Sequence, residues 1–139
     1  AHFYVQVVDY ICEVTKALLH CTRPAYEHIN NNHTGFTSEQ IKDLKMISDG
    51  VNNIFYVINK MLREKDFKGL DSVMQMRDDL FDTIAECIKS QIKRLKEVEG
   101  STRSSALYFN LLNETKTMML QSRNVIKAQA YFLNEIDEK

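Results

Sequence analysis

Turn-forming residues are scarce in this chain, which has only four glycines and one proline among its 139 residues. An all-β fold would need turn residues about every 8–12 positions, so this scarcity argues against one. Long uncharged stretches are also missing: the uncharged run at residues 50–59 is about half of the roughly 20 apolar residues that cross a bilayer. No secretory leader pattern opens the chain. Long helices joined by few turns are the alternative that remains.

An excess of charge of one sign is also absent, because 18 basic residues face 19 acidic ones and the formal net charge is -1. This balance argues against a protein that binds nucleic acid or an anionic membrane through its bulk charge. Apolar residues make up 44% of the chain and charged residues 27%, which is ordinary for a soluble globular protein. The length is that of one domain, residues 1–139.

The cysteines are too few and wrongly spaced for a disulfide framework. Their number is odd, and Cys12 and Cys21 fall on opposite sides of a helix at about 100° per residue. We interpret these two and Cys87 as reduced, buried small apolar residues of a protein in a reducing compartment.

Three polar breaks divide the chain into four segments of similar length. In the first, residues 30–36, Asn and Gly accept turn conformations, and Thr37 and Gln40 follow at the spacing of a capping box. The second surrounds Asp66, the predicted cap of the third helix. The third, residues 99–102, is typical of a C-terminal glycine followed by the cap of a new helix.

Between the breaks, apolar residues recur every three or four positions, as on helices with one buried face. The predicted buried stripes are, segment by segment, Val5, Val8, Ile11, Leu18 and Tyr26; Ile41, Leu44, Val51, Phe55, Ile58 and Leu62; Val73, Leu80, Ile84, Ile88 and Leu95; and Leu107, Leu111, Met118, Val125 and Phe132. Each segment of about 30 residues would form a helix of about 45 Å. Short links force successive helices to run antiparallel, so the sequence predicts an all-α, up-and-down four-helix bundle.

Pro24 is the one local conflict with this prediction. It lies inside the first segment and lacks the amide that would donate to the carbonyl of His20. We expect a kink or a break near residues 21–23, and we favour a bend that wraps the first helix around the bundle.

Carboxylates form the most suggestive cluster. Asp78, Asp82 and Glu86 are spaced four residues apart, so they lie one above another on a helix and repel each other. A solvated acidic stripe balanced by Arg77 and Lys89 is one interpretation. A ladder of ligands for a divalent cation is the other, since hard cations take oxygen from several carboxylates.

Two charged residues fall on apolar stripes, where buried charges need partners. They are Arg77 and Glu114. We expect them to pair across the seam between the third and fourth helices; the alternative is that the helices rotate enough for each to reach water.

Motifs for catalysis or nucleic-acid binding are missing. No Glu-x-x-His pair of a di-iron site, glycine-rich phosphate loop, His-Glu-x-x-His zinc site or Cys-x-x-Cys pair occurs. A basic group near the end of the third segment suits the negative end of a helix dipole and is too local for a nucleic-acid footprint. It consists of Lys89, Lys93, Arg94 and Lys96.

Residues 47–54 (ISDGVNNI) and residues 77–82 (RDDLFD) resemble the PhoU family, whose helices carry an acid-x-x-x-Asp motif and an Asp followed four residues later by Asn-Ile. From Val7 to Phe132, the chain is also similar to the soluble PhoU-like C-terminal region of bacterial sodium/phosphate cotransporter-family proteins. The resemblance implies a PhoU-like bundle that forms part of a longer membrane protein.

The same resemblance implies metal-binding acids at Asp49, Asp78 and Asp82. Other acid positions of the family pattern are occupied here by Lys45, Lys116 and Leu120. We therefore expect no resident cofactor and no tightly bound iron or zinc cluster. If a cation binds, we expect weakly held Mg²⁺ or Ca²⁺ at Asp78 and Asp82, helped by Asp49.

In function, the resemblance implies a cytoplasmic regulatory domain and not an enzyme. It would be attached to the bacterial inner membrane through an upstream transmembrane region and would modulate phosphate transport by contacting that transporter portion of the same protein. A homodimer is left open, and no nucleic-acid partner or direct membrane insertion is expected. The alternatives are a signalling or scaffold bundle that acts only by helix–helix association, and a metal-dependent enzyme that uses Asp78 and Asp82.

Overall fold

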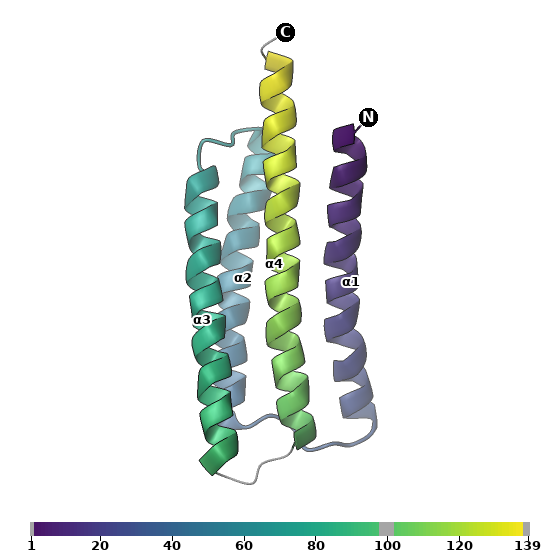
Figure 1. Ribbon diagram of the computed structural model, residues 1–139, viewed down its shortest axis with the longest axis vertical. Helices are drawn as coiled ribbons and strands as arrows, with labels where there is room; N and C mark the ends of the chain where they lie inside the picture. The colour runs from purple at the N-terminus through teal and green to yellow at the C-terminus, as the bar shows by residue number, and fades with distance from the viewer. Residues whose placement is uncertain (1, 98–101, 138–139) are drawn as a thin grey trace.

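The computed structural model describes residues 2–97 and 102–137, with side chains described as far as Leu133. It contains four helices: α1 (His2–Asn30), α2 (Ser38–Glu64), α3 (Leu70–Glu97) and α4 (Thr102–Asp137). No strand occurs in these two ranges. Successive helices run in opposite directions along one long axis (Figure 1). The predicted all-α, antiparallel four-helix bundle is therefore confirmed.

The start and end of α2 follow from local chemistry. The Thr37 side chain accepts from the Gln40 amide, and the Gln40 side chain accepts from the Thr37 amide at 2.9 Å, which confirms the predicted capping box. At the other end, Lys65 adopts a left-handed conformation with φ of 53°, and its amide donates to the Met61 carbonyl. This turn stops the helix and satisfies one of its last carbonyls.

The other two breaks depart from the predicted caps or lie outside the described residues. Asp66 does not cap α3, because that helix begins four residues later at Leu70. Its carboxylate instead accepts from the Lys68 amide at 3.1 Å and so shapes the turn before the helix. The predicted glycine end and cap at the third break fall largely on residues 98–101, outside the described residues.

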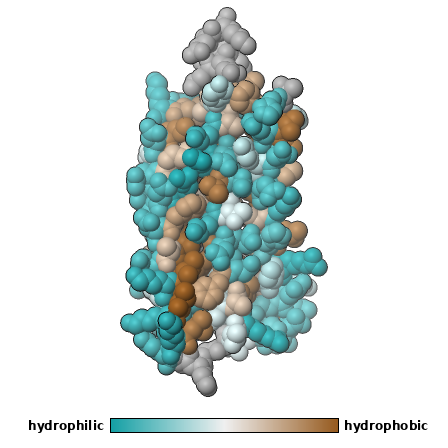
Figure 2. Space-filling model, viewed as in Figure 1, coloured by the Kyte–Doolittle hydropathy of each residue, from teal (hydrophilic) through white to brown (hydrophobic). Residues whose placement is uncertain are grey.

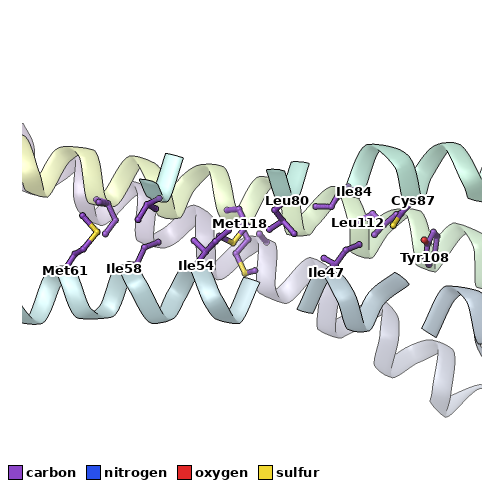
Figure 3. Packing of buried hydrophobic residues seen from close by; sticks show 14 residues of the cluster. Ile47, Ile54, Ile58, Met61, Leu80, Ile84, Cys87, Tyr108, Leu112 and Met118 are labelled. Carbon is purple, nitrogen blue, oxygen red and sulfur yellow. The ribbon is translucent and has the colours of Figure 1, made fainter. Parts of the chain in front are cut away.

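The hydrophobic core is built almost entirely from α2, α3 and α4 (Figure 3). Its members recur at intervals of three, four or seven residues on each helix, the spacing of a seam between nearly antiparallel helices. They include Ile47, Ile54, Ile58 and Met61 from α2, Val73, Leu80, Ile84 and Cys87 from α3, and Tyr108, Leu112, Met119 and Ile126 from α4. At Gly50, a Cβ atom would lie 2.9 Å from Leu80 Cδ1, so the missing side chain lets α2 and α3 approach closely.

Helix α1 packs differently from the other three. Its Cα atoms come within 8 Å of α4 but of neither α2 nor α3, and Ala17 is its one buried residue among those described. The prediction of a buried stripe on α1 is wrong, because all five of its residues are exposed: Val5, Val8, Ile11, Leu18 and Tyr26. The fold is thus a three-helix core with a fourth helix laid along the outside of α4.

The central position of α4 explains this arrangement. One set of its buried residues, including Tyr108 and Leu112, belongs to the core cluster. A second face includes the buried Leu107, which comes one position before Tyr108 and lies outside that cluster. Because one position corresponds to about 100° on a helix, α4 carries two packing faces and separates α1 from the rest.

Pro24 lies inside a continuous helix. Helix α1 runs from His2 to Asn30 without interruption, so of the two predicted alternatives near residues 21–23, a kink or a break, the break does not occur. The kink at Pro24 stays a prediction.

Candidate functional site

Helix α1 carries apolar side chains on two faces, of which only one is covered. The residues that lose solvent alternate at intervals of three and four, and we call them the inner stripe: Phe3, Val7, Tyr10, Val14, Ala17, Cys21, Pro24 and His28. Since α4 is the only helix near α1, the inner stripe faces α4. The remaining large apolar residues of α1 are exposed, and we call them the outer stripe: Tyr4, Val5, Val8, Ile11, Leu18, Leu19, Tyr26 and Ile29.

The outer stripe is a continuous band and not a scatter of single residues. Its residues come one or two positions after residues of the inner stripe, so it occupies the adjacent face along the whole helix. Two threonines within the band, Thr15 and Thr22, donate their hydroxyls to the carbonyls of Ile11 and Leu18, at 3.0 and 2.9 Å. These bonds satisfy the polar atoms within the helix and leave a mainly apolar surface. Brown, apolar side chains stand out along the α1 edge in Figure 2, which also shows an apolar strip over the seam of α3 and α4.

A polar contact compensates for Pro24 and fixes α1 on α4. Pro24 has no amide to donate to the His20 carbonyl. The side chain of Asn110 on α4 donates to that carbonyl instead, at 2.8 Å. About one turn further along α4, Glu114 brings its carboxylate to 3.6 Å from His20 Nδ1. The missing amide of Pro24 therefore leaves the His20 carbonyl free to accept a hydrogen bond from α4.

Both ends of α1 are also held against α4. Near the start of α1, the Phe3 ring lies 5.1 Å from the Tyr131 ring. Near its end, the Arg103 guanidinium lies 2.9 Å from His33 Nε2. Partial desolvation, the neighbouring Arg103 charge and His28 lower the pKa of His33. The orientation of the outer stripe is therefore fixed at several points along the helix.

The structure places the three predicted metal-binding acids on exposed parts of α2 and α3. Asp78 accepts from the Arg77 guanidinium, with 3.0 Å between Nε and Oδ1. Asp82 borders a shallow groove with Glu86, whereas Asp49 is not among the residues that line it. Within residues 2–97 and 102–137, no three His, Cys, Asp or Glu side chains are grouped so that they could hold a metal ion. The weak cation site stays a prediction.

The predicted pair between Arg77 and Glu114 is wrong. Arg77 turns to Asp78 on its own helix and lies over the Phe81 ring, 5.6 Å from its centroid. Glu114 faces His20 on the other side of α4. Arg77 and Glu114 therefore lie on different sides of α4, and each pairs with a nearer residue there.

A polar network that the sequence analysis missed joins α2, α3 and α4 at the end of the core near Ser38. Asp43 Oδ2 accepts from Arg94 at 3.0 Å and from the hydroxyl of the fully buried Tyr108 at 2.8 Å. Arg94 Nε also donates to Gln91, which in turn donates to Ser105 at 3.1 Å. Burial and the bond to Asp43 raise the pKa of Tyr108. The sequence did contain a signal for this network, because Tyr108 and Gln91 fall at apolar positions of their helices.

The cysteines are all free, as predicted, but they do not share one environment. Cys87 is buried beside the polar network, and burial raises the pKa of its thiol. Cys21 is half-buried on the inner stripe, and burial raises its pKa as well. Cys12 is exposed, so the prediction that it is buried is wrong.

No family model, curated protein or solved structure matches this chain in the comparisons with known proteins. Among the helices in the described part of the chain, none has the length and apolar content needed to cross a membrane. On geometric grounds, the exposed apolar outer stripe of α1 is the strongest candidate for a functional surface.

Proposed function

We propose that this chain is a regulatory domain of a sodium/phosphate cotransporter-like protein. In this proposal it lies on the cytoplasmic side of the bacterial inner membrane, is joined to an upstream transmembrane transporter portion, and modulates phosphate transport through protein–protein contacts. It has no catalytic role. The PhoU-like motifs at residues 47–54 and 77–82 support the assignment to phosphate transport, and the antiparallel helical fold is compatible with it.

The observation that carries a role in binding is the outer stripe of α1. Monomeric soluble proteins rarely expose large contiguous apolar surfaces, and such surfaces mark interaction sites. Here eight large apolar side chains lie exposed along one helix, while the other face of that helix is fixed on α4. A bundle of this kind can present a docking helix without having to unfold.

Tethering makes a weak contact sufficient. A domain joined to its partner by a linker meets it at an effective concentration that can reach the millimolar range. The contact with the transporter portion can therefore form and break in response to a change in either part. A divalent cation at Asp78 and Asp82 would be an accessory to this role. We propose it as weakly bound, since Arg77 already neutralises Asp78.

Phosphate uptake by cells that carry the native protein tests the proposal. Deleting residues 1–139 should leave membrane insertion intact and alter phosphate uptake or its response to external phosphate. The variant Ile11→Glu/Leu18→Glu should have the same effect without removing the domain, because it places two charges on the outer stripe.

A matched control uses α2, where Ile41 and Tyr56 are also exposed but belong to no comparable band. The variant Ile41→Glu/Tyr56→Glu should leave uptake unchanged. Uptake that is unaffected by the deletion at both low and high phosphate, with normal protein abundance, would contradict the transporter assignment and favour the scaffold alternative.

A further inference from the structure

We infer that the outer stripe of α1 binds the outer stripe of a second copy of this chain, with the two α1 helices antiparallel. This inference rests on the proposed function and narrows it: the outer stripe joins the domains of two copies, and the paired domains make the regulatory contact with the transporter portion. The two-fold axis passes between Lys16 and Ala17, near the middle of the helix. In the dimer, the two α1 helices lie between the two three-helix cores.

The exposed area matches what a stable dimer needs. The eight side chains of the outer stripe are between 40% and 76% exposed. With roughly 150–250 Å² for a fully exposed aromatic side chain and about 100 Å² for an aliphatic one, they present on the order of 600 Å². A stable protein–protein interface buries about 800 Å² on each partner. The stripe therefore supplies most of the area that one partner contributes to a stable dimer.

The register of an antiparallel pair follows from the spacing of the stripe. An axis between positions 16 and 17 sets Tyr4 opposite Ile29 of the second copy, and Ile11 opposite Thr22. It also sets Leu18 opposite Thr15. Each of these three layers combines a large side chain with a smaller or similar one, as helix seams require. Because both threonine hydroxyls are bonded within their own helix, neither is left without a partner.

The charges along one edge of the stripe favour the antiparallel orientation. Asp9 precedes the centre of the helix and Arg23 follows it at a nearly equal distance. An antiparallel pair therefore brings Asp9 of each copy to the level of Arg23 of the other and to the same side of the seam, whereas a two-fold parallel pair places equivalent charges on opposite sides of the seam and forms no such ion pair. Lys16 lies near the axis, where its own copy would repel it, but Glu13 pairs with it within the chain.

The same charges argue against a membrane as the partner of the outer stripe. Helices that lie on anionic membranes carry Lys and Arg along their polar face. The charged residues of α1 are instead mixed, with three acids and two bases: Asp9, Glu13, Glu27, Lys16 and Arg23. An antiparallel α1 helix of a second copy carries the complementary charges, so it fits the charged edge of the outer stripe better than a membrane does.

Sedimentation equilibrium of the 139-residue chain tests the inference. The parent chain should form a dimer, and Ile11→Glu/Leu18→Glu should raise the dissociation constant by at least about 100-fold, because two buried contacts become buried charges. The control Ile41→Glu/Tyr56→Glu should dimerise like the parent. Circular dichroism of both variants checks that the helices remain. A parent chain that is monomeric throughout the micromolar range, or an outer-stripe variant that dimerises like the parent, would overturn the inference.

Cross-linking tests the orientation. In a background with Cys12→Ser and Cys21→Ser, a mixture of Ile11→Cys and Thr22→Cys chains should form a mixed disulfide under mild oxidation. An antiparallel pair brings these two positions together, whereas a parallel pair would join Ile11→Cys chains to each other. Charge reversal gives a second test: Asp9→Arg and Arg23→Asp should each weaken the dimer, and the double variant should recover it.

The outcomes separate this inference from the proposed function. A chain that stays monomeric while its outer-stripe variant alters phosphate uptake would reject the second copy as the partner and keep the regulatory role. A chain that dimerises through α1 while uptake ignores the outer-stripe variant would keep the dimer and reject the regulatory role.

Discussion

Helix α1 and the core helices α2 and α3 have comparable amphipathic patterns but bury them to very different extents. Among the described residues, α2 and α3 each contribute five buried side chains, whereas α1 contributes Ala17 alone. The difference lies in the number of neighbours. In the core, α2, α3 and α4 contact one another, but α1 contacts only α4. A helix with two apolar faces and one neighbour leaves one of these faces exposed.

The largest expected effect is a difference between core and α1 substitutions in the free energy of unfolding. Ile84 is fully buried in the core, so Ile84→Ala should lower the free energy of unfolding by roughly 2–5 kcal/mol. Ile11 is half exposed on α1, and Ile11→Ala should change it by no more than about 0.5 kcal/mol. Urea denaturation of dilute samples, followed by circular dichroism, measures both. Equal losses would show that α1 belongs to the core.

A smaller effect is expected from the polar network of the core. Tyr108→Phe removes the hydroxyl that donates to Asp43 while leaving the ring in place. We expect a loss of about 1 kcal/mol, because the Asp43 carboxylate keeps its bond to Arg94. The same denaturation measurement applies. A gain in stability on this substitution would mean that the buried hydroxyl is not satisfied as described.

The contact between Asn110 and α1 can be tested against Pro24 in a double-mutant cycle. Asn110→Ala should cost about 1 kcal/mol, because the His20 carbonyl loses its donor. Pro24→Ala restores a backbone amide to that carbonyl, so Asn110→Ala should cost clearly less in this background. If the two costs are equal, the side chain of Asn110 does not replace the missing amide.

The smallest effect concerns pH at the junction of α1 and α4. His33 has a lowered pKa in the folded chain, so the unfolded chain binds its proton first as the pH falls. The contribution of His33 is therefore fully present above its ordinary pKa of about 6.5 and decreases as the pH falls through the lowered folded pKa. His33→Gln should flatten this part of the stability profile. An unchanged profile would assign the pH dependence to other groups.

Much of the fold could be predicted because it depends on local signals. The capping box of Thr37 and Gln40 and the turn residues of the first break act within a few positions, and both mark helix ends in the structure. Long helices with short links then leave little choice but an antiparallel arrangement. Asp66 misled the prediction, because an Asp can shape a turn as readily as it can cap a helix.

The arrangement around α1 could not be predicted in the same way. Val8 and Ile11 form as good a stripe as Val7 and Val14, and periodicity alone does not say which stripe faces a neighbour. Arg77 on an apolar stripe indicated an interhelical pair, but it had a carboxylate beside it on its own helix. The partner of Tyr108 depends on Asp43, 65 positions earlier in the chain, which no local pattern reveals.

Hydrogen exchange of the backbone amides tests the central claim most directly, because it reports the opening of α1 and of the core separately. The measurement is best made on Ile11→Glu/Leu18→Glu, in which α1 has no partner other than α4. The account predicts that amides in α1 exchange through an opening that costs less free energy than global unfolding, while central amides of α2, α3 and α4 exchange only on global unfolding. Equal protection of central amides in all four helices would contradict it.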